Sequence, residues 1–447
     1  MRFARALAAW LAVLLGAIAL SALIPPLQSP DEHSHIFRGY ALSKGRVALE
    51  TPPGESTGSR FDEGILYFVR PYLLHIVGEK TKRLTPADEA FAKSQTWQGK
   101  EHFFSIPGAG YYFPAVYTPH ALAFGIGQAL DLSVAHTYRL TRALCIVAGL
   151  ALLALAMRVQ RPPPLAAALL LLPMTLFQLV LPTIDGITTS AAALALALFM
   201  RRSLGDGDAP AWHAWALAAS LFLLATTRVH LTPLLVLPFV LYWRFRTRRD
   251  LWLGLAVAAA SLAWTLYALA HTVDARIKRD HGTTELLLHY ARHPLDFFRV
   301  VAASFTDEKL STFYSQSFIG ILGWLDTIMR PGFYVALWIG LALCAGASLA
   351  GVSLRRAAPE RLLLAGAAVA SVLLAFFALL VTWTPHPAAT VEGVQGRYFI
   401  VPALAVAYAF AAAPHDRPRR WATYGLPAAF GALSLYALIA TLLARYH

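Results

Sequence analysis

The chain has 447 residues, of which 57% are hydrophobic and 14% charged, and its mean hydropathy is +0.54. Such a composition excludes a water-soluble globular protein and is typical of polytopic membrane proteins. The net charge of +13 would suit a nucleic-acid-binding protein, but six short tracts between apolar runs hold 16 Arg against five acidic residues. This is the positive-inside pattern of membrane proteins. The lipid bilayer is therefore the predicted partner, and no nucleic-acid partner is predicted.

The first apolar run, residues 6–24, is close to the roughly 20 residues that a helix needs to cross a bilayer. Basic residues precede it, as they do in signal peptides, but the run is long and is followed by PPLQSP, without an A-x-A-like cleavage site. We therefore expect a retained transmembrane helix that begins in the cytoplasm.

Eleven further apolar runs follow, and if all twelve crossed the membrane the later basic tracts would lie on the outer side. The run at 115–132 is the weakest, because it carries Pro119, His120 and Gln128 and follows an aromatic stretch, so we expect it to lie at the membrane interface. Eleven spans then remain. They cover residues 6–24, 140–157, 163–181, 184–200, 211–226, 230–243, 251–271, 332–353, 362–383, 398–413 and 421–443.

The predicted fold is thus an all-α polytopic membrane protein, a single integral-membrane domain over residues 1–447. Its two long polar segments, residues 25–139 and 272–331, are predicted as outside loops, and the first contains interfacial helices. Cys145 and Cys344 both lie in apolar runs, so neither a disulfide framework nor a thiolate metal site is predicted.

An acidic pair, Asp31 and Glu32, stands where the first span ends, in SPDEHSHIFRG (residues 29–39). Asp31 can be the N-cap of a helix that begins near His33. Alternatively the pair can supply a general base, since repulsion between adjacent carboxylates raises the pKa of one of them. His33 and His35 are two residues apart and do not share a helix face, which disfavours a two-histidine metal site. His35 is kept as a substrate-binding candidate.

Arg397 lies in VQGRYF, just before a predicted span. It can be an interfacial anchor together with Tyr398, or it can bind phosphate, with Gly393 and Gly396 letting the backbone come close to the ligand. Two further cations, Arg228 and His230, lie in a predicted outside turn and are expected to join this phosphate site. Gln395 is a candidate for substrate contact.

Three other outside residues are candidates for substrate binding. Asp185 either caps the span that follows it or belongs to the site. Trp324 is either an interfacial anchor or a platform on which a sugar ring stacks, and Asp326 is either a helix cap or an acceptor for sugar hydroxyls. A general base and a phosphate-binding group are what a transferase needs when its leaving group is a lipid-linked phosphate.

These features resemble the GT-C superfamily of integral-membrane glycosyltransferases. More narrowly, residues 29–39, 173–194, 320–327 and 394–402 look like the motifs of a family of bacterial predicted membrane proteins, domain of unknown function 2142. The resemblance implies an inverting transfer from a polyprenyl-phosphate sugar donor to a glycan or lipid-linked acceptor, at the periplasmic face of the bacterial inner membrane. Asp31 matches the catalytic Asp of the superfamily, with Glu32 beside it, and Arg397 would hold the donor phosphate.

Two other classes of function stay open. A transporter or flippase would usually show inverted repeats and charges within its spans, which are not found here. A polymerase or ligase that acts on a polyprenyl-diphosphate glycan would also need outside arginines. The sequence predicts no particular cofactor. A divalent metal remains possible, but no clear second acidic metal motif is present, so metal dependence is left open.

Overall fold

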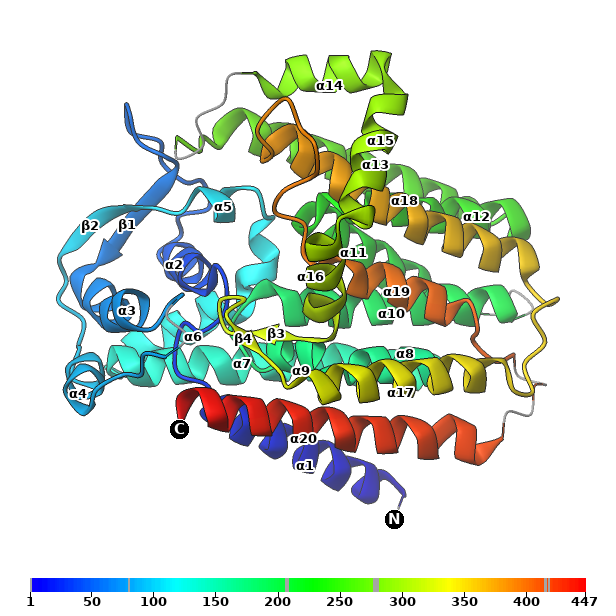
Figure 1. Cartoon of the computed structure of the whole chain (residues 1–447), viewed down its shortest axis with the longest axis horizontal. Helices are drawn as coiled ribbons and strands as arrows, with labels where there is room; N and C mark the ends of the chain where they lie inside the picture. Colours follow the sequence, from blue (N-terminus) through cyan, green and yellow to red (C-terminus); the bar gives the residue numbers. More distant parts are fainter. Residues whose placement is uncertain (1, 79–80, 206–208, 276–280, 414–415, 417–418) are drawn as a thin grey trace.

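The computed structural model describes residues 2–78, 81–205, 209–275, 281–413, 416 and 419–447, with side chains from residue 8 onward. Long helices lie side by side along one axis (Figure 1). Six are long and apolar enough to cross a membrane within this described part of the chain. They are α7 (Val134–Val159), α10 (Ile184–Leu204), α13 (Arg248–His271), α17 (Pro331–Leu349), α18 (Ala358–Thr382) and the segment Trp421–Tyr446, which comprises η4 (Trp421–Gly425) and α20 (Leu426–Tyr446).

The other predicted spans are shorter or divided. They correspond to α1 (Arg2–Ala22), α8 (Pro164–Leu170) with α9 (Pro173–Leu179), α11 (Ala211–Thr227), η2 (Val229–Val236) with α12 (Leu237–Phe245), and η3 (Gly396–Phe399) with α19 (Ile400–Tyr408). The prediction of one continuous span over 163–181 is wrong. Pro173 has no N–H to donate and disfavours a helical residue before it, so α8 ends and α9 begins there.

The all-α membrane fold predicted from the sequence is confirmed, with every predicted span lying on helical segments. The C-terminus is at the end of the bundle where the first long polar segment lies (Figure 1). One end carries the two long polar segments, and we call it the long-loop end. The other carries the basic tracts and is called the basic end; residues 206–208 and 417–418 of those tracts lie outside the described residues.

Helix α10 lies at the centre of the bundle, and 89% of its most apolar window is buried. Its sequence is apolar on all sides and rich in alanine, so neighbouring helices can pack closely around it. It packs against α7, α11 and α19. Because α10 is held on every side, the residues in its first turn have a fixed position at the long-loop end.

The first long segment folds into a small layer at the long-loop end. It contains α2 (Glu32–Ser43), β1 (Gly58–Asp62), α3 (Glu63–His75), α4 (Pro86–Lys93), β2 (Glu101–Ser105), α5 (Pro107–Gly110), η1 (Pro114–Tyr117) and α6 (Thr118–Ala129). Strands β1 and β2 are antiparallel, with Gly58 opposite Ser105, and aromatic side chains such as Phe37 and Phe61 form a core below them. The segment predicted as interfacial, 115–132, is η1 and α6, which packs on α2 and α7.

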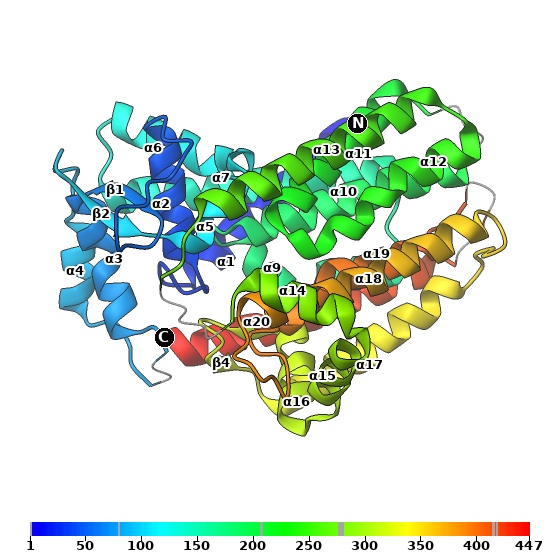
Figure 2. The same cartoon turned by 90° about the horizontal axis from the view of Figure 1, so that it is seen from above.

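The second long segment contains α14 (Thr283–Arg292), α15 (Pro294–Thr306) and α16 (Glu308–Ile319), then the hairpin β3 (Ile321–Leu322) and β4 (Thr327–Ile328). Figure 2 shows these helices beside α18 and α19, and the layer of α2–α6 at one end of the molecule. The two small sheets were not predicted. Both lie in the long polar segments, outside the predicted spans. Such short strands leave no clear pattern of apolar residues in the sequence.

Candidate functional site

Glu32 shapes the loop between α1 and α2. Its carboxylate is fully buried and accepts hydrogen bonds from the backbone N–H groups of Leu27 (3.1 Å) and Ser29 (3.2 Å) and from the hydroxyl of Tyr138. Burial raises the pKa of Glu32, opposed by the Arg142 guanidinium 3.9 Å away and by these hydrogen bonds. Glu32 is therefore a positioning residue for the loop that precedes it, since both carboxylate oxygens are already occupied by protein groups.

Arg142 joins this loop to two helices. Its guanidinium donates to the backbone carbonyls of Ser21 (2.8 Å), Ile24 (2.7 Å) and Pro25 (2.9 Å), and its Nε donates to the Tyr138 hydroxyl (2.8 Å). Carbonyls at the C-terminus of a helix have no partner within the helix, so a buried cation there satisfies them. The end of α1 is thus fixed against α7.

Asp31 is presented to solvent by this framework. It is exposed, has the left-handed backbone conformation (φ 63°, ψ 5°), and makes no side-chain hydrogen bond to the helix that it precedes. The interpretation of Asp31 as a side-chain helix cap is therefore wrong. A non-glycine residue in this conformation costs on the order of 1–3 kcal/mol and persists only where its surroundings enforce it, as Glu32 does here.

Three predicted site residues from distant parts of the sequence meet in one ion-paired cluster, the Asp185–Arg228–Arg397 cluster. Arg228 donates to Asp185 Oδ1, and Arg397 Nη1 lies 3.6 Å from Asp185 Oδ2. The side chains of Arg228, Asp185 and Arg397 are 17%, 15% and 7% exposed. Asp185 makes no capping hydrogen bond to α10, whose N-cap is Thr183. Its carboxylate instead holds the two guanidinium groups in position.

Helix α16 passes directly over the residue before Arg397. A Cβ atom at Gly396 would lie 2.0 Å from the backbone carbonyl oxygen of Tyr314, so only glycine allows this approach. Gly393 (φ 78°) is covered by the Trp383 ring, 2.9 Å from where its Cβ would be. The expectation that these glycines leave room for a phosphate is wrong, because protein groups fill both positions. They fix Arg397 instead.

The Nε of Arg397 is buried and has no hydrogen-bond partner among the described residues. A buried guanidinium N–H without an acceptor is costly, and a bound anion would supply one. Asp31 lies close enough to Arg397 to interact with it electrostatically. The structure therefore brings an exposed carboxylate and a buried, incompletely paired cation into one neighbourhood.

Aromatic residues and histidines line the side of the cluster formed by the first long segment. His35 Nδ1 is 2.9 Å from the Tyr117 hydroxyl, and Arg228 donates to the Tyr112 hydroxyl at 3.3 Å. Burial raises the pKa of both tyrosines and lowers that of His35 well below its usual value. These groups are neutral near pH 7, so they add hydrogen-bonding capacity without charge.

The remaining predicted residues divide into two groups. Tyr398 and His230 lie at the cluster: the Tyr398 ring is 5.7 Å from the Arg397 guanidinium and 5.9 Å from the His230 ring. Gln395 precedes Arg397 and has a buried Oε1 without a hydrogen-bond partner in the described chain.

Trp324 and Asp326 belong to the β3–β4 hairpin. Trp324 donates from its indole to the Leu27 carbonyl (2.7 Å) and stacks on His33, with ring centroids 5.8 Å apart. Asp326 is buried and lies 3.9 Å from Arg445. Neither residue caps a helix, and Trp324 helps to hold the loop that ends in Asp31.

The described residues contain no group of three or more His, Cys, Asp or Glu side chains that could hold a metal ion. His33 and His35 turn to different partners, Trp324 and Tyr117, as their spacing predicts.

Four residues of this site are not among the sequence predictions: Tyr112, Tyr117, Tyr138 and Arg142. Arg142 gave a usable signal, because a charged residue within an apolar run is a candidate for function by default. Tyr138 is four residues earlier, on the same helix face. The two other tyrosines are in an aromatic stretch that membrane-interface anchoring also explains.

We expect stability to depend on two buried histidines. Burial lowers the pKa of His120 to about 4, and that of His35 is also lowered. Above the ordinary histidine pKa of 6.5 both are neutral in the folded and unfolded states. Below it the unfolded chain binds protons that the folded chain does not, so each histidine removes up to about 1.4 kcal/mol of stability per pH unit.

Thermal unfolding of the detergent-solubilised protein between pH 7.5 and pH 4.5 measures this effect. The unfolding temperature should fall with pH below about 6.5, and the fall should be smaller in His120→Gln. A constant unfolding temperature across this range would contradict the burial of neutral histidines.

The fold and the site define a polytopic membrane protein with an ionisable cluster at one end of its helix bundle. Residues 14–407 match the family described as predicted membrane protein (DUF2142), and the chain belongs to that family. No curated protein and no solved structure matches the chain.

Proposed function

We propose that this protein is a glycosyltransferase that moves a sugar from a polyprenyl-phosphate donor to an acceptor glycan or lipid-linked glycan at the periplasmic face of the bacterial inner membrane. One observation carries the proposal: an exposed, strained Asp31 is held near Arg397, a buried cation with an unpaired N–H. A transferase with a phosphate leaving group needs a base that faces the acceptor and a cation close by that faces the phosphate.

In the proposed reaction the carboxylate of Asp31 takes the proton of an acceptor hydroxyl. The acceptor oxygen forms a bond to the anomeric carbon of the sugar, and the bond between that carbon and the donor phosphate oxygen breaks. The electron pair leaves with the polyprenyl phosphate, whose negative charge Arg397 stabilises. A single displacement of this kind inverts the anomeric configuration.

The surrounding residues have supporting roles in this proposal. Asp185 keeps both guanidinium groups in a fixed orientation, which lowers the cost of binding phosphate. Arg228 and His230 contribute to the phosphate site, and His35, Gln395 and Tyr398 offer polar contacts to the sugar or the phosphate. The polyprenyl chain would remain in the bilayer against the apolar helix surfaces.

A transporter or flippase fits the arrangement less well. Secondary transporters place their ionisable residues near the middle of the bilayer, between repeats. Here Asp185 is in the first turn of α10, Arg228 directly follows α11, and Arg397 precedes α19. The cluster is therefore at helix ends, where a substrate can be reached from one side of the membrane.

The test is a mass-spectrometric profile of surface glycans and lipid-linked sugars in strains that express the wild type, Arg397→Ala or the control Arg60→Ala at equal membrane abundance. Arg60 is an exposed arginine on β1, outside the cluster. We expect Arg397→Ala alone to lose a specific sugar from the glycan and to accumulate its polyprenyl-linked donor. An unchanged glycan, or loss of the sugar without accumulation of donor, would count against the proposal.

A further inference from the structure

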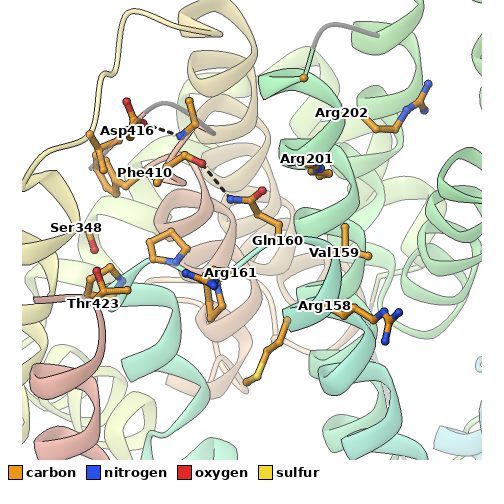
Figure 3. A pocket seen from close by; sticks show the side chains of 18 of the residues that line it. Arg158, Val159, Gln160, Arg161, Arg201, Arg202, Ser348, Phe410, Asp416 and Thr423 are labelled. Carbon is orange, nitrogen blue, oxygen red and sulfur yellow. Dashed lines mark hydrogen bonds between the residues drawn. The ribbon is translucent and has the colours of Figure 1, made fainter. Parts of the chain in front are cut away.

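A cavity lies at the basic end, opposite the candidate site. Its volume is about 1050 Å³. It is lined by the end of α7, the start of α8, the end of α10, the start of α11, the end of α17 and residues 410, 412, 413, 416, 420, 423 and 424. Figure 3 shows Arg201 on the last turns of α10 and Arg161 just after α7, both lining this space. This volume is at the upper end of the range for small-molecule sites.

Positive charge dominates the lining. Arg158, Arg161, Arg201 and Arg420 border the cavity and form no ion pair among the described residues. Asp416 is the only acidic side chain that lines it in the described part of the chain. Its carboxylate is engaged, because it accepts hydrogen bonds from backbone N–H groups of the surrounding loops.

Other arginines at this end form ion pairs or hydrogen bonds with protein groups. Arg202 makes a two-pronged pair with Asp250, at 2.6 Å and 2.7 Å, and Arg244 pairs with Glu360. Arg361 donates to the Ala411 carbonyl at 2.9 Å. The positive-inside tendency accounts for arginines in these loops, but it does not require four of them to border one cavity.

The wall of the cavity contains fixed polar groups. Gln160 donates to the Ala412 carbonyl at 3.1 Å, which ties the end of α7 to the segment that follows α19. His213 lines the cavity, is 6% exposed, and has a buried Nδ1 without a hydrogen-bond partner in the described chain. The Gln160 hydrogen bond therefore fixes part of the cavity wall beside the arginines.

We infer that this cavity binds a phosphate-bearing ligand. Guanidinium groups bind phosphate oxygens through paired N–H donors. Among the described residues, the arginines that line the cavity outnumber its one carboxylate, which favours an anion. Two sources share this chemistry: the headgroup of an anionic phospholipid in the adjacent leaflet, and a soluble phosphate ester. The exposed rings of Trp212 and Tyr424 also line the cavity, at a place where a bilayer interface favours them.

The experiment uses the purified 447-residue protein in neutral detergent. Native mass spectrometry counts bound phosphatidylglycerol against phosphatidylcholine, and calorimetry measures binding of inorganic pyrophosphate. The test variant is Arg161→Gln/Arg201→Gln. The matched control, Arg246→Gln/Arg248→Gln, removes the same charge from exposed residues at the same end that do not line the cavity.

We expect at least a tenfold loss of affinity in the test variant and less than a twofold change in the control, since only the test variant loses charge-assisted contacts to the phosphate. Binding of phosphatidylglycerol alone identifies a lipid headgroup, and binding of pyrophosphate identifies a soluble ester. Equal losses of affinity in both variants would overturn the inference. So would a wild type that neither prefers phosphatidylglycerol over phosphatidylcholine nor binds pyrophosphate.

Discussion

Replacement of Asp31 by Asn should reduce sugar transfer by about 10²- to 10⁴-fold, the usual contribution of a general base. Asn has nearly the same shape as Asp and tolerates the left-handed backbone conformation, so the loop should keep its structure. It cannot accept a proton at neutral pH. The measurement is the amount of the transferred sugar in surface glycan, per folded protein in the membrane.

Asp131 provides the matched control for this variant. It is also an exposed Asp with a positive φ (50°), in the turn between α6 and α7, and it makes no contact with the Asp185–Arg228–Arg397 cluster. Asp131→Asn should leave transfer unchanged. If Asp31→Asn transfers as well as Asp131→Asn, the role of Asp31 as the base is wrong.

Replacement of Asp185 by Asn should have the second largest effect, and it should act on both stability and activity. It leaves Arg228 and Arg397 buried without their countercharge, and breaking a buried ion pair in this way costs about 3–5 kcal/mol. The unfolding temperature in detergent should fall. The remaining folded protein should also transfer sugar more slowly, because the guanidinium groups lose their fixed orientation.

Asp250→Asn separates the two effects. Asp250 is a buried partner of Arg202 at the basic end, so its loss should cost comparable stability. Transfer per folded protein should stay normal in that variant. An equal loss of specific activity in both variants would mean that Asp185 acts through stability alone.

The sequence was informative about the bundle because apolar run length and charge placement directly reflect the bilayer. It was less informative about helix continuity, since Pro173 divides one run into α8 and α9 while leaving its hydrophobicity unchanged. The small layer formed by α2–α6 could not be predicted in detail. Its core is built from contacts between residues far apart in the chain, such as Phe37 with Phe61.

The gathering of Asp185, Arg228 and Arg397 could be predicted, because the parity of the spans places their three loops at one end of the bundle. Their pairing could not, because it depends on the exact rotation and depth of α10 and α11. Glu32 illustrates the same limit. The acidic pair could be recognised in the sequence. Only the contacts with Tyr138 and Arg142 distinguish the buried positioning residue Glu32 from the exposed Asp31.

One measurement tests the central claim most directly. Lipid extract from the Asp31→Asn strain, which should contain the accumulated donor, is incubated with purified wild type or Asp31→Asn protein and with glycan acceptor. The release of polyprenyl phosphate is then followed by mass spectrometry. The account predicts release with the wild type, together with a gain of one sugar by the acceptor, and release slower by about 10²- to 10⁴-fold with Asp31→Asn. Absence of release with the wild type, or equal release with both, would contradict it.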